Sequence, residues 1–310
     1  MSECVLVFGA SGFVGRNLVE RLSVERRHVI AVTSSGTHVP GATTTVSLDR
    51  LNDLPALPAD TVAVHLAAYR YDSQRFDLAQ SDILVNNTTI NTRIFHFCAE
   101  RKVSEMRLGS SVAVYPAGLA MMDDAVATDF SQPPNPGEAF YAWSKRYAEI
   151  MAVLYATKFG LNCLTFRFAN PYGPYDSVNP NKAHVAPAFV MKALDSNPVF
   201  PIRGDPSVER DFTFVGDVVD VLMRSLAWRE RNETYNLCSG RSTTLAELAD
   251  TVMKVAGVNK KIKAGAPGAF GPAKRISTSD RLKAAFGVTF TSLEVGMQPT
   301  VEWYRREFRG

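Results

Sequence analysis

The sequence has few cysteines, and they lie far apart. Its 310 residues include Cys4, Cys98, Cys163 and Cys238, with no CxxC pair. Because paired or clustered cysteines are needed to hold zinc or to build a disulfide framework, neither is predicted. We expect no bound metal and a reducing, cytoplasmic location.

Long apolar runs and an excess of either charge are also missing. No apolar stretch approaches the roughly 20 residues that span a bilayer, and no basic segment precedes the apolar run after Met1, so neither a membrane helix nor a signal peptide is predicted. The 34 basic and 31 acidic side chains give a formal net charge of +3. This balance does not favour a nucleic acid or a membrane as partner.

What the sequence does contain is an alternation of apolar runs and helical patterns. Apolar runs at 5–8, 29–32, 61–68, 105–111 and 163–168 alternate with helical patterns such as 82–100 and 140–159. This is typical of a parallel sheet covered on both faces. We predict an α/β fold with a doubly wound (Rossmann) sheet in residues 1–170. Residues 171–310 are loop-rich and predict a smaller, irregular substrate domain, from which about 212–240 return to the sheet.

The first motif is GASGFVG, at the turn from the first predicted strand into the first helix. Glycines let the backbone approach a pyrophosphate, which the free N–H groups and positive end of the helix then hold. We therefore expect a dinucleotide at this turn. The expected contacts are Gly9, Ser11, Gly12, Phe13, Val14 and Gly15.

The second predicted strand ends without a carboxylate. An acidic side chain there accepts hydrogen bonds from the ribose of NAD and repels the 2′-phosphate of NADP. Here the strand ends in VTSSG, which includes Ser34, and Arg16 follows the last motif glycine. The sequence favours NADP(H), with both residues as contacts. NAD(H) stays possible, with Arg16 as a solvated helix residue.

Tyr141 and Lys145 lie four residues apart in the segment YAWSK, on one face of a predicted helix. Lowering the pKa of a phenol from about 10 by about three units, so that it can transfer protons at neutral pH, needs about 4 kcal/mol. A positive charge at about 4 Å and an effective dielectric near 20 supplies about that much. In a parallel sheet, this helix and the serines of LGSS would meet at one edge.

With the glycine turn, the serine strand and the Tyr-x-x-x-Lys pair in this order, the sequence resembles the extended short-chain dehydrogenases/reductases, in the epimerase/dehydratase branch that modifies nucleotide-linked sugars. The resemblance covers nearly the whole chain. Other similar segments are HLAA (65–68), NNTTINT (86–92), FRFANPYGP (166–174), RDFTFVGDV (210–218), 236–249 and 292–307. LGSS, the YP that follows it, and residues 181–194 most resemble the 4-keto reductases of the GDP-fucose synthase type.

The resemblance implies a role for each matching residue. Ser111 would polarise the substrate, with Ser110 as the alternative. Tyr141 would be the general acid/base, and Lys145 would bind the nicotinamide ribose and lower the tyrosine pKa. Further implied cofactor contacts are Asp49, Arg50, Leu66, Ala67, Ala68 and Asn87. Implied substrate contacts are Ser110, Val112, Asn170, His184, Val185, Arg210 and Arg275.

Two of these residues have simpler interpretations. Arg210 would clamp the diphosphate with its guanidinium group, or it could form a surface pair with Asp211. Asn170 would lie beside the nucleotide sugar, or it could be a turn residue before Pro171.

Ser111 is followed by Val112 and Ala113. The dehydratases that the chain resembles carry Asp-Glu here, because loss of water across two carbons needs an extra acid and base, so dehydration is not expected. In the fucose synthase type, a cysteine at the Val112 position and a histidine at the His184 position move protons on ring carbons. Valine cannot be such a base, so His184 would bind substrate, cap or pack.

Three functions stay open. The first is NADPH-dependent reduction of a nucleotide-linked 4-keto-6-deoxy sugar at carbon 4, with Tyr141 as proton donor. The second is a nucleotide-sugar 4-epimerase with tightly bound NAD, and the third is a non-catalytic dinucleotide-binding regulatory protein. The resemblance also implies a homodimer through the helix at 82–100 and the Tyr-Lys helix, both of which have more apolar residues than one core needs.

Overall fold

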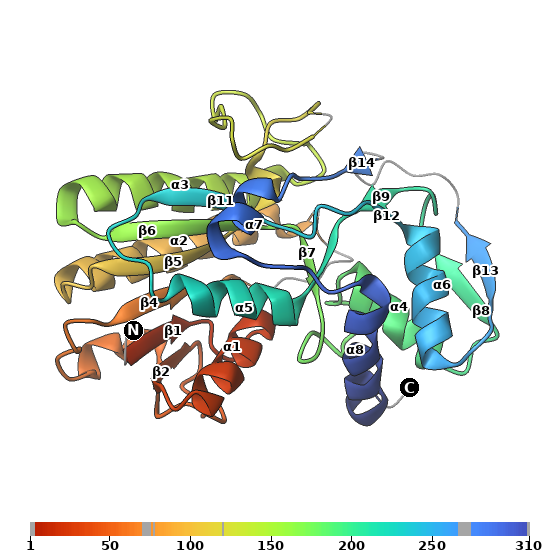
Figure 1. Cartoon of the computed structure of the whole chain (residues 1–310), viewed down its shortest axis with the longest axis horizontal. Coiled ribbons are helices and arrows are strands. Elements are labelled where there is room, and N and C mark those ends of the chain that lie inside the picture. Colours follow the sequence, from red (N-terminus) through yellow and green to blue (C-terminus); the bar gives the residue numbers. More distant parts are fainter. Residues whose placement is uncertain (1–3, 70–75, 77, 120, 266–273, 309–310) are drawn as a thin grey trace.

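The computed structural model describes residues 4–69, 76, 78–119, 121–265 and 274–308. Its largest element is a seven-stranded parallel sheet with the strand order β11-β6-β5-β4-β1-β2-β3, shown in Figure 1. The strands are β1 (Cys4–Phe8), β2 (His28–Thr33), β3 (Thr44–Ser47), β4 (Val62–His65), β5 (Glu105–Ser111), β6 (Asn162–Phe168) and β11 (Glu233–Leu237). The predicted doubly wound α/β sheet is confirmed.

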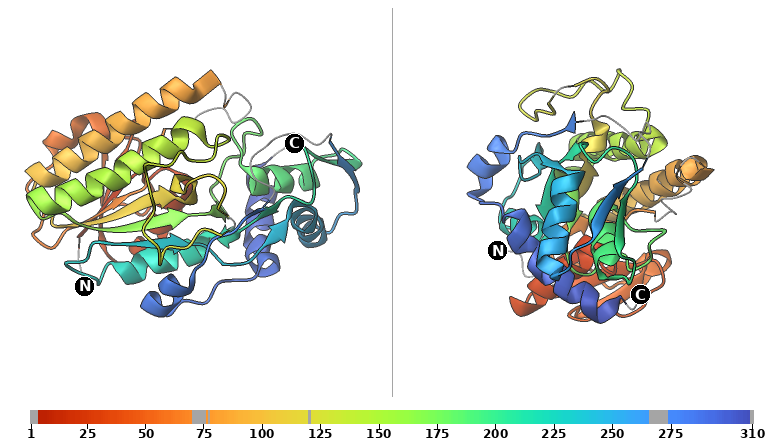
Figure 2. Two further views of the ribbon diagram at one scale, coloured as in Figure 1. Left: turned by 90° about the horizontal axis from the view of Figure 1, so that it is seen from above. Right: turned by 90° about the vertical axis from the view of Figure 1, so that its right-hand side faces the viewer.

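Helices cover both faces of this sheet. In β1, Val5 and Val7 pack in the core beneath α1 (Phe13–Val24), α5 (Val215–Ser225) and α7 (Asp280–Phe286). The alternate residues Leu6 and Phe8 pack in the opposite core, beneath α2 (Gln80–Glu100) and α3 (Ala139–Phe159), as expected for a pleated strand. Figure 2 shows α2 and α3 alongside each other on that face. Among the described residues, no helix is both long and apolar enough to cross a membrane.

The strand order reverses next to β1. From β1 the chain builds outward through β2 and β3, and it then returns to the other side of β1 to add β4, β5 and β6. In sheets of this type the crevice at such a reversal, beyond the carboxyl ends of the strands, is the usual ligand site. The topology therefore predicts a ligand site formed by the residues after β1, β4 and β5.

The second unit lies beside this edge of the sheet (Figure 1). Its helices are α4 (Val185–Leu194), α6 (Leu245–Ala256) and α8 (Leu293–Glu307). Its short strands are β7 (Asn170–Tyr172), β8 (Val199–Ile202), β9 (Glu209–Arg210), β10 (Phe212–Phe214), β12 (Thr243–Thr244), β13 (Lys261–Ala264) and β14 (Lys274–Arg275). It has its own apolar core, which includes Phe189, Phe200, Leu248 and Met297. Between β10 and β12, the chain returns to the large sheet as α5 and β11.

Candidate active site

A cavity of about 870 Å³ lies where the strand order reverses, between the two units. Residues at or just after the carboxyl ends of β1, β2, β4, β5 and β6 line it, together with Lys182, His184, Val185, Ala186 and Phe212 of the second unit. The predicted site residues that line it are Gly9, Ser11, Gly12, Phe13, Val14, Gly15, Ser34, Leu66, Ala67, Ala68, Ser110, Ser111, Val112, Tyr141, Lys145, Asn170, His184 and Val185. The fold thus gathers most of the predicted site around one cavity.

The glycine turn has a shape that a dinucleotide requires. Gly9 has φ +79°, and a Cβ atom added there would lie 2.7 Å from the backbone nitrogen of Ala67. A Cβ atom added at Gly15 would overlap the carbonyl oxygen of Gly9. α1 begins directly after Gly12 without a side-chain cap, so its first N–H groups are available to an anion in the cavity. These residues fit the diphosphate of a nicotinamide dinucleotide.

The two serines at the end of β5 have different partners. The Ser110 hydroxyl donates a 2.6 Å hydrogen bond to the buried carboxylate of Glu149. The Ser111 oxygen accepts a 3.1 Å hydrogen bond from the Ala113 N–H, at the start of the 3₁₀ turn Val112–Val114. The Ser111 hydroxyl therefore retains its hydrogen for donation, as a group that polarises a carbonyl must.

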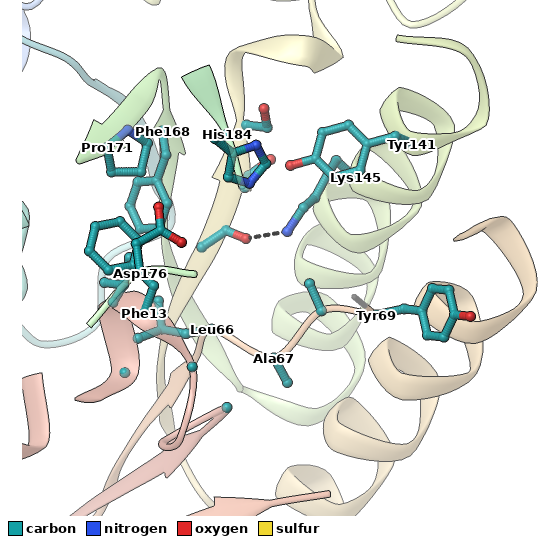
Figure 3. A pocket seen from close by; sticks show the side chains of 18 of the residues that line it. Phe13, Leu66, Ala67, Tyr69, Tyr141, Lys145, Phe168, Pro171, Asp176 and His184 are labelled. Atoms are coloured by element: carbon teal, nitrogen blue, oxygen red, sulfur yellow. Dashed lines mark hydrogen bonds between the residues drawn. The ribbon is translucent and has the colours of Figure 1, made fainter. Parts of the chain in front are cut away.

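Tyr141 and Lys145 project from α3 into the cavity, and His184 faces the Tyr141 hydroxyl from the opposite side (Figure 3). The Lys145 Nζ donates a 3.0 Å hydrogen bond to the Gly109 carbonyl and lies 6.0 Å from the centre of the Tyr141 ring. Burial lowers the pKa of Lys145 from 10.5 to about 8, against an opposing contribution from Glu149. At neutral pH the lysine thus remains a cation near the phenol.

Asn87 lies behind the cavity and links two of its walls. Its Oδ1 accepts a 2.8 Å hydrogen bond from the Tyr69 N–H, after β4. Its Nδ2 donates to Ser144 Oγ at 3.3 Å, and the Ser144 hydroxyl donates to the Tyr141 carbonyl at 2.7 Å. In this structure Asn87 therefore holds the segment after β4 against the first turn of α3. Its predicted contact with the cofactor stays a prediction.

Three other predicted cofactor residues have partners outside the cavity. Arg16 lies over the ring of Tyr175, with 5.3 Å between its Cζ and the ring centre. Asp49 and Arg50 follow β3 in the 3₁₀ segment Leu48–Asp53. Asp49 pairs with Arg93 at 2.8 Å, and Arg50 pairs with Asp53 at 2.6 Å.

The predicted substrate residues fall into two groups. Asn170 lines the cavity and donates a 2.8 Å hydrogen bond from Nδ2 to the Asp211 carbonyl. Arg210 lies on β9 and donates to the Glu209 carbonyl at 2.7 Å, without lining the cavity. The backbone of Arg275, in β14, pairs with the backbone of Arg210. The side chain of Arg275 is outside the described residues. A diphosphate role for either arginine stays a prediction.

The cavity also contains residues that the sequence did not single out. Glu138, Asp176 and Lys182 line it with charged side chains, and Tyr69 lines it after β4. Asp176 is buried, and its Oδ1 accepts a hydrogen bond from the Ser177 N–H at 2.7 Å. These residues lie in or beside loops without apolar periodicity, so their only signal was their closeness in sequence to Ala68, Tyr141, Asn170 and His184.

Comparisons with known proteins identify the family of the chain. The model of the NAD dependent epimerase/dehydratase family matches residues 5–238. The dTDP-4-dehydro-6-deoxy-D-allose reductase of Streptomyces bikiniensis is 29% identical over 98% of this chain and 97% of its own. The GDP-L-fucose synthase of Sinorhizobium fredii is 26% identical over 73% of each chain.

Among solved structures, the UDP-glucose 4-epimerase of Thermotoga maritima with UDP-glucose superimposes with a TM-score of 0.83. That match covers 98% of this chain and 99% of the other at 23% identity, which is a likeness of fold. The family match spans the glycine turn, Ser111, Tyr141 and Lys145. The chain therefore belongs to the NAD dependent epimerase/dehydratase family, and it is an NAD(P)-dependent enzyme of the extended short-chain dehydrogenase/reductase type.

Proposed function

We propose that the protein reduces the 4-keto group of a nucleotide-linked 4-keto-6-deoxy sugar with NADPH. The observation that carries the proposal is the composition of the cavity at the end of β5. Ser111, Tyr141 and Lys145 meet there, while the buried Val112 and Ala113 occupy the next two positions. The site thus has the groups to reduce one carbonyl carbon and lacks a second acid/base beside the serine. The similarity to a dTDP-4-dehydro-6-deoxy-D-allose reductase supports this substrate class.

Ser111, Tyr141 and Lys145 have different roles in the proposed reduction. The glycine turn and the N-terminus of α1 would hold a nicotinamide cofactor, which would supply the hydride for the keto carbon. The Ser111 hydroxyl donates a hydrogen bond to the keto oxygen, and Tyr141 transfers its phenolic proton to that oxygen as the alcohol forms. The positive charge of Lys145 stabilises the phenolate that remains on Tyr141. The carbonyl thus gains one hydride and one proton.

The preference for NADPH is supported by the end of β2. Ser34 is exposed and lines the cavity there, and the strand ends in hydroxyl groups with no carboxylate to repel a 2′-phosphate. Arg16 is stacked on Tyr175, so the proposal depends on Ser34 and on the missing carboxylate. The glycine turn and the N-terminus of α1 would hold the diphosphate.

The test is NADPH oxidation with a panel of dTDP- and GDP-linked 4-keto-6-deoxy sugars, with Tyr141→Phe as the matched control. We expect oxidation by the wild type and a product labelled at carbon 4 when deuterated NADPH is used. In D₂O we expect no carbon-bound deuterium at the neighbouring ring carbons, because Val112 cannot act as a base. No oxidation with any substrate refutes the proposal. Copurified NAD with interconversion of hexose epimers would instead establish a 4-epimerase.

We also propose that two chains associate through α2 and α3. The outer face of these helices exposes apolar side chains, including Val153 (67% exposed) and Leu154 (56%). A shallow apolar hollow next to them is lined by residues such as Leu84, Trp143 and Ile150. Apolar groups on neighbouring helices are suited to a four-helix contact between two copies.

A further inference from the structure

Glu149 is a buried carboxylate that joins three elements behind the cavity. It lies on α3, one turn beyond Lys145. Its Oε1 accepts hydrogen bonds from the Ser110 hydroxyl on β5 at 2.6 Å and from Arg167 Nε on β6 at 3.0 Å. Its Oε2 accepts from Arg167 Nη2 at 2.7 Å. A buried carboxylate needs such partners, because its desolvation is otherwise very costly.

The position and the charge of Lys145 depend on β5 and Glu149. Its ammonium group donates to the carbonyl of Gly109, the residue before Ser110 on β5. Burial disfavours the charged form of this amine and lowers its pKa to about 8, and the negative charge of Glu149 opposes that effect. Helical residues four apart lie on one face, with about 5–6 Å between their Cβ atoms. Glu149 is therefore close enough to act on the charge of Lys145.

We propose that Glu149 is a positioning residue that keeps Lys145 protonated and holds β5 beneath it, while Arg167 balances the charge of Glu149. The functional part of this inference rests on the proposed role of Lys145 in the reduction. The arrangement accounts for two adjacent serines, since Ser110 anchors the strand to Glu149 and Ser111 remains available to a substrate.

Other charged and titratable groups lie near Lys145 or near the Glu149–Arg167 pair, and they enter the electrostatic balance. Near Lys145 these are His65 on β4 and the cavity-lining Tyr141, Glu138, Asp176, Lys182 and His184. Around Glu149 and Arg167 they are Arg146 on α3, Cys163 on β6 and Tyr115 after β5. Burial, with a further contribution from Lys145, lowers the pKa of His65 to about 3, so His65 is neutral. Burial raises the pKa of Cys163 to about 12, so that thiol is neutral as well.

The experiment measures the charge of Lys145 directly, by NMR titration of protein labelled with ¹³C at the lysine Cε. The Lys145 signal is assigned by its absence in Lys145→Met. In Glu149→Gln the midpoint should fall by one to two units, about a 10- to 100-fold change, because a unit charge at about 6 Å is removed while Arg167 stays charged. In Arg167→Met the midpoint should rise, because Glu149 loses its balancing charge.

Two further variants separate electrostatics from structure. The double variant Glu149→Gln/Arg167→Met removes both charges and should return the midpoint to within about half a unit of the wild-type value. Ser110→Ala keeps both charges and removes only the hydrogen bond that anchors β5 to Glu149, so it should move the midpoint much less than Glu149→Gln does. If Glu149→Gln does not fold, the opposite shift in Arg167→Met and the restored midpoint in the double variant test the same coupling.

A wild-type midpoint in folded Glu149→Gln, or in Arg167→Met, overturns the inference. The pH profile of NADPH oxidation is the second readout, and its basic limb should move with the NMR midpoint in each variant. If no 4-keto sugar is reduced, the proposed function fails while the NMR result still decides the coupling. If oxidation proceeds and the midpoint does not move, the coupling fails and the proposed function stands.

Discussion

Replacing Lys145 with methionine should abolish activity and yet stabilise the protein at neutral pH. The lysine is held in a largely buried position in which its pKa falls from 10.5 to about 8. A shift of about 2.5 units corresponds to about 3 kcal/mol, which folding must supply to bury the charged amine. Methionine has a similar shape and no charge, so it removes this cost.

The pH dependence identifies the origin of the effect. Below pH 8 the amine is protonated in both the folded and the unfolded chain, and the full cost of about 3 kcal/mol applies. Between pH 8 and 10.5 the unfolded chain holds a proton that the folded one has released, so wild-type stability gains from rising pH. Methionine also loses the hydrogen bond to Gly109, worth about 1 kcal/mol. The variant should therefore be more stable by about 2 kcal/mol at pH 7 and about equal to wild type at pH 10.

Urea unfolding of the ligand-free wild type and Lys145→Met at about pH 7, 8.5 and 10 measures this difference. Lys158→Met, an exposed lysine on the same helix, is the matched control and should show no comparable trend. A difference between wild type and Lys145→Met that stays constant from pH 7 to 10 would refute the argument. A variant less stable than wild type at pH 7 would refute it as well.

Three further predictions test the site and the assembly. Gly9→Ala places a Cβ atom 2.7 Å from the Ala67 nitrogen, at a residue with φ +79°. NADPH affinity, measured by fluorescence titration, should therefore fall at least about tenfold. An unchanged affinity would show that the turn does not hold the cofactor. Tyr141→Phe should lower kcat about 100- to 10,000-fold with little change in NADPH affinity, and retained turnover would exclude the phenol as proton donor. Val153→Glu introduces a charge on the exposed face of α3 and should convert a dimer into a monomer in light scattering, whereas a monomeric wild type would contradict the proposed assembly.

The fold was largely predictable because its signals are local. Continuous apolar runs marked the buried strands, and the helical pattern at 82–100 corresponds to α2 at Gln80–Glu100. The glycine turn could be predicted from the sequence because Gly9 and Gly15 must leave room for neighbouring backbone atoms. The Tyr141–Lys145 pair was visible for a similar reason, since the spacing of four residues fixes its geometry on a helix.

The parts that could not be predicted depend on contacts between distant residues. Ser110 meets Glu149 39 residues later, and nothing in LGSS indicates which of its two hydroxyls will be engaged. Arg16 follows the glycine motif in a position suited to a phosphate, but the loop that brings Tyr175 beneath it comes from the second unit. Tertiary packing sets the directions of these side chains, and the spacing of apolar residues along the sequence does not reveal them.

The late position of β11 in the chain has a consequence for how the protein can be made and altered. β11 pairs with β6 along Leu164–Phe168, so a chain ending near residue 170 would expose β6 as an open edge, a template for aggregation. During synthesis the sheet stays incomplete until Leu237 has been made. To give this protein the substrate preference of a relative, one would therefore replace the cavity loops one at a time. The segment that contains α5 and β11 would stay with the N-terminal sheet.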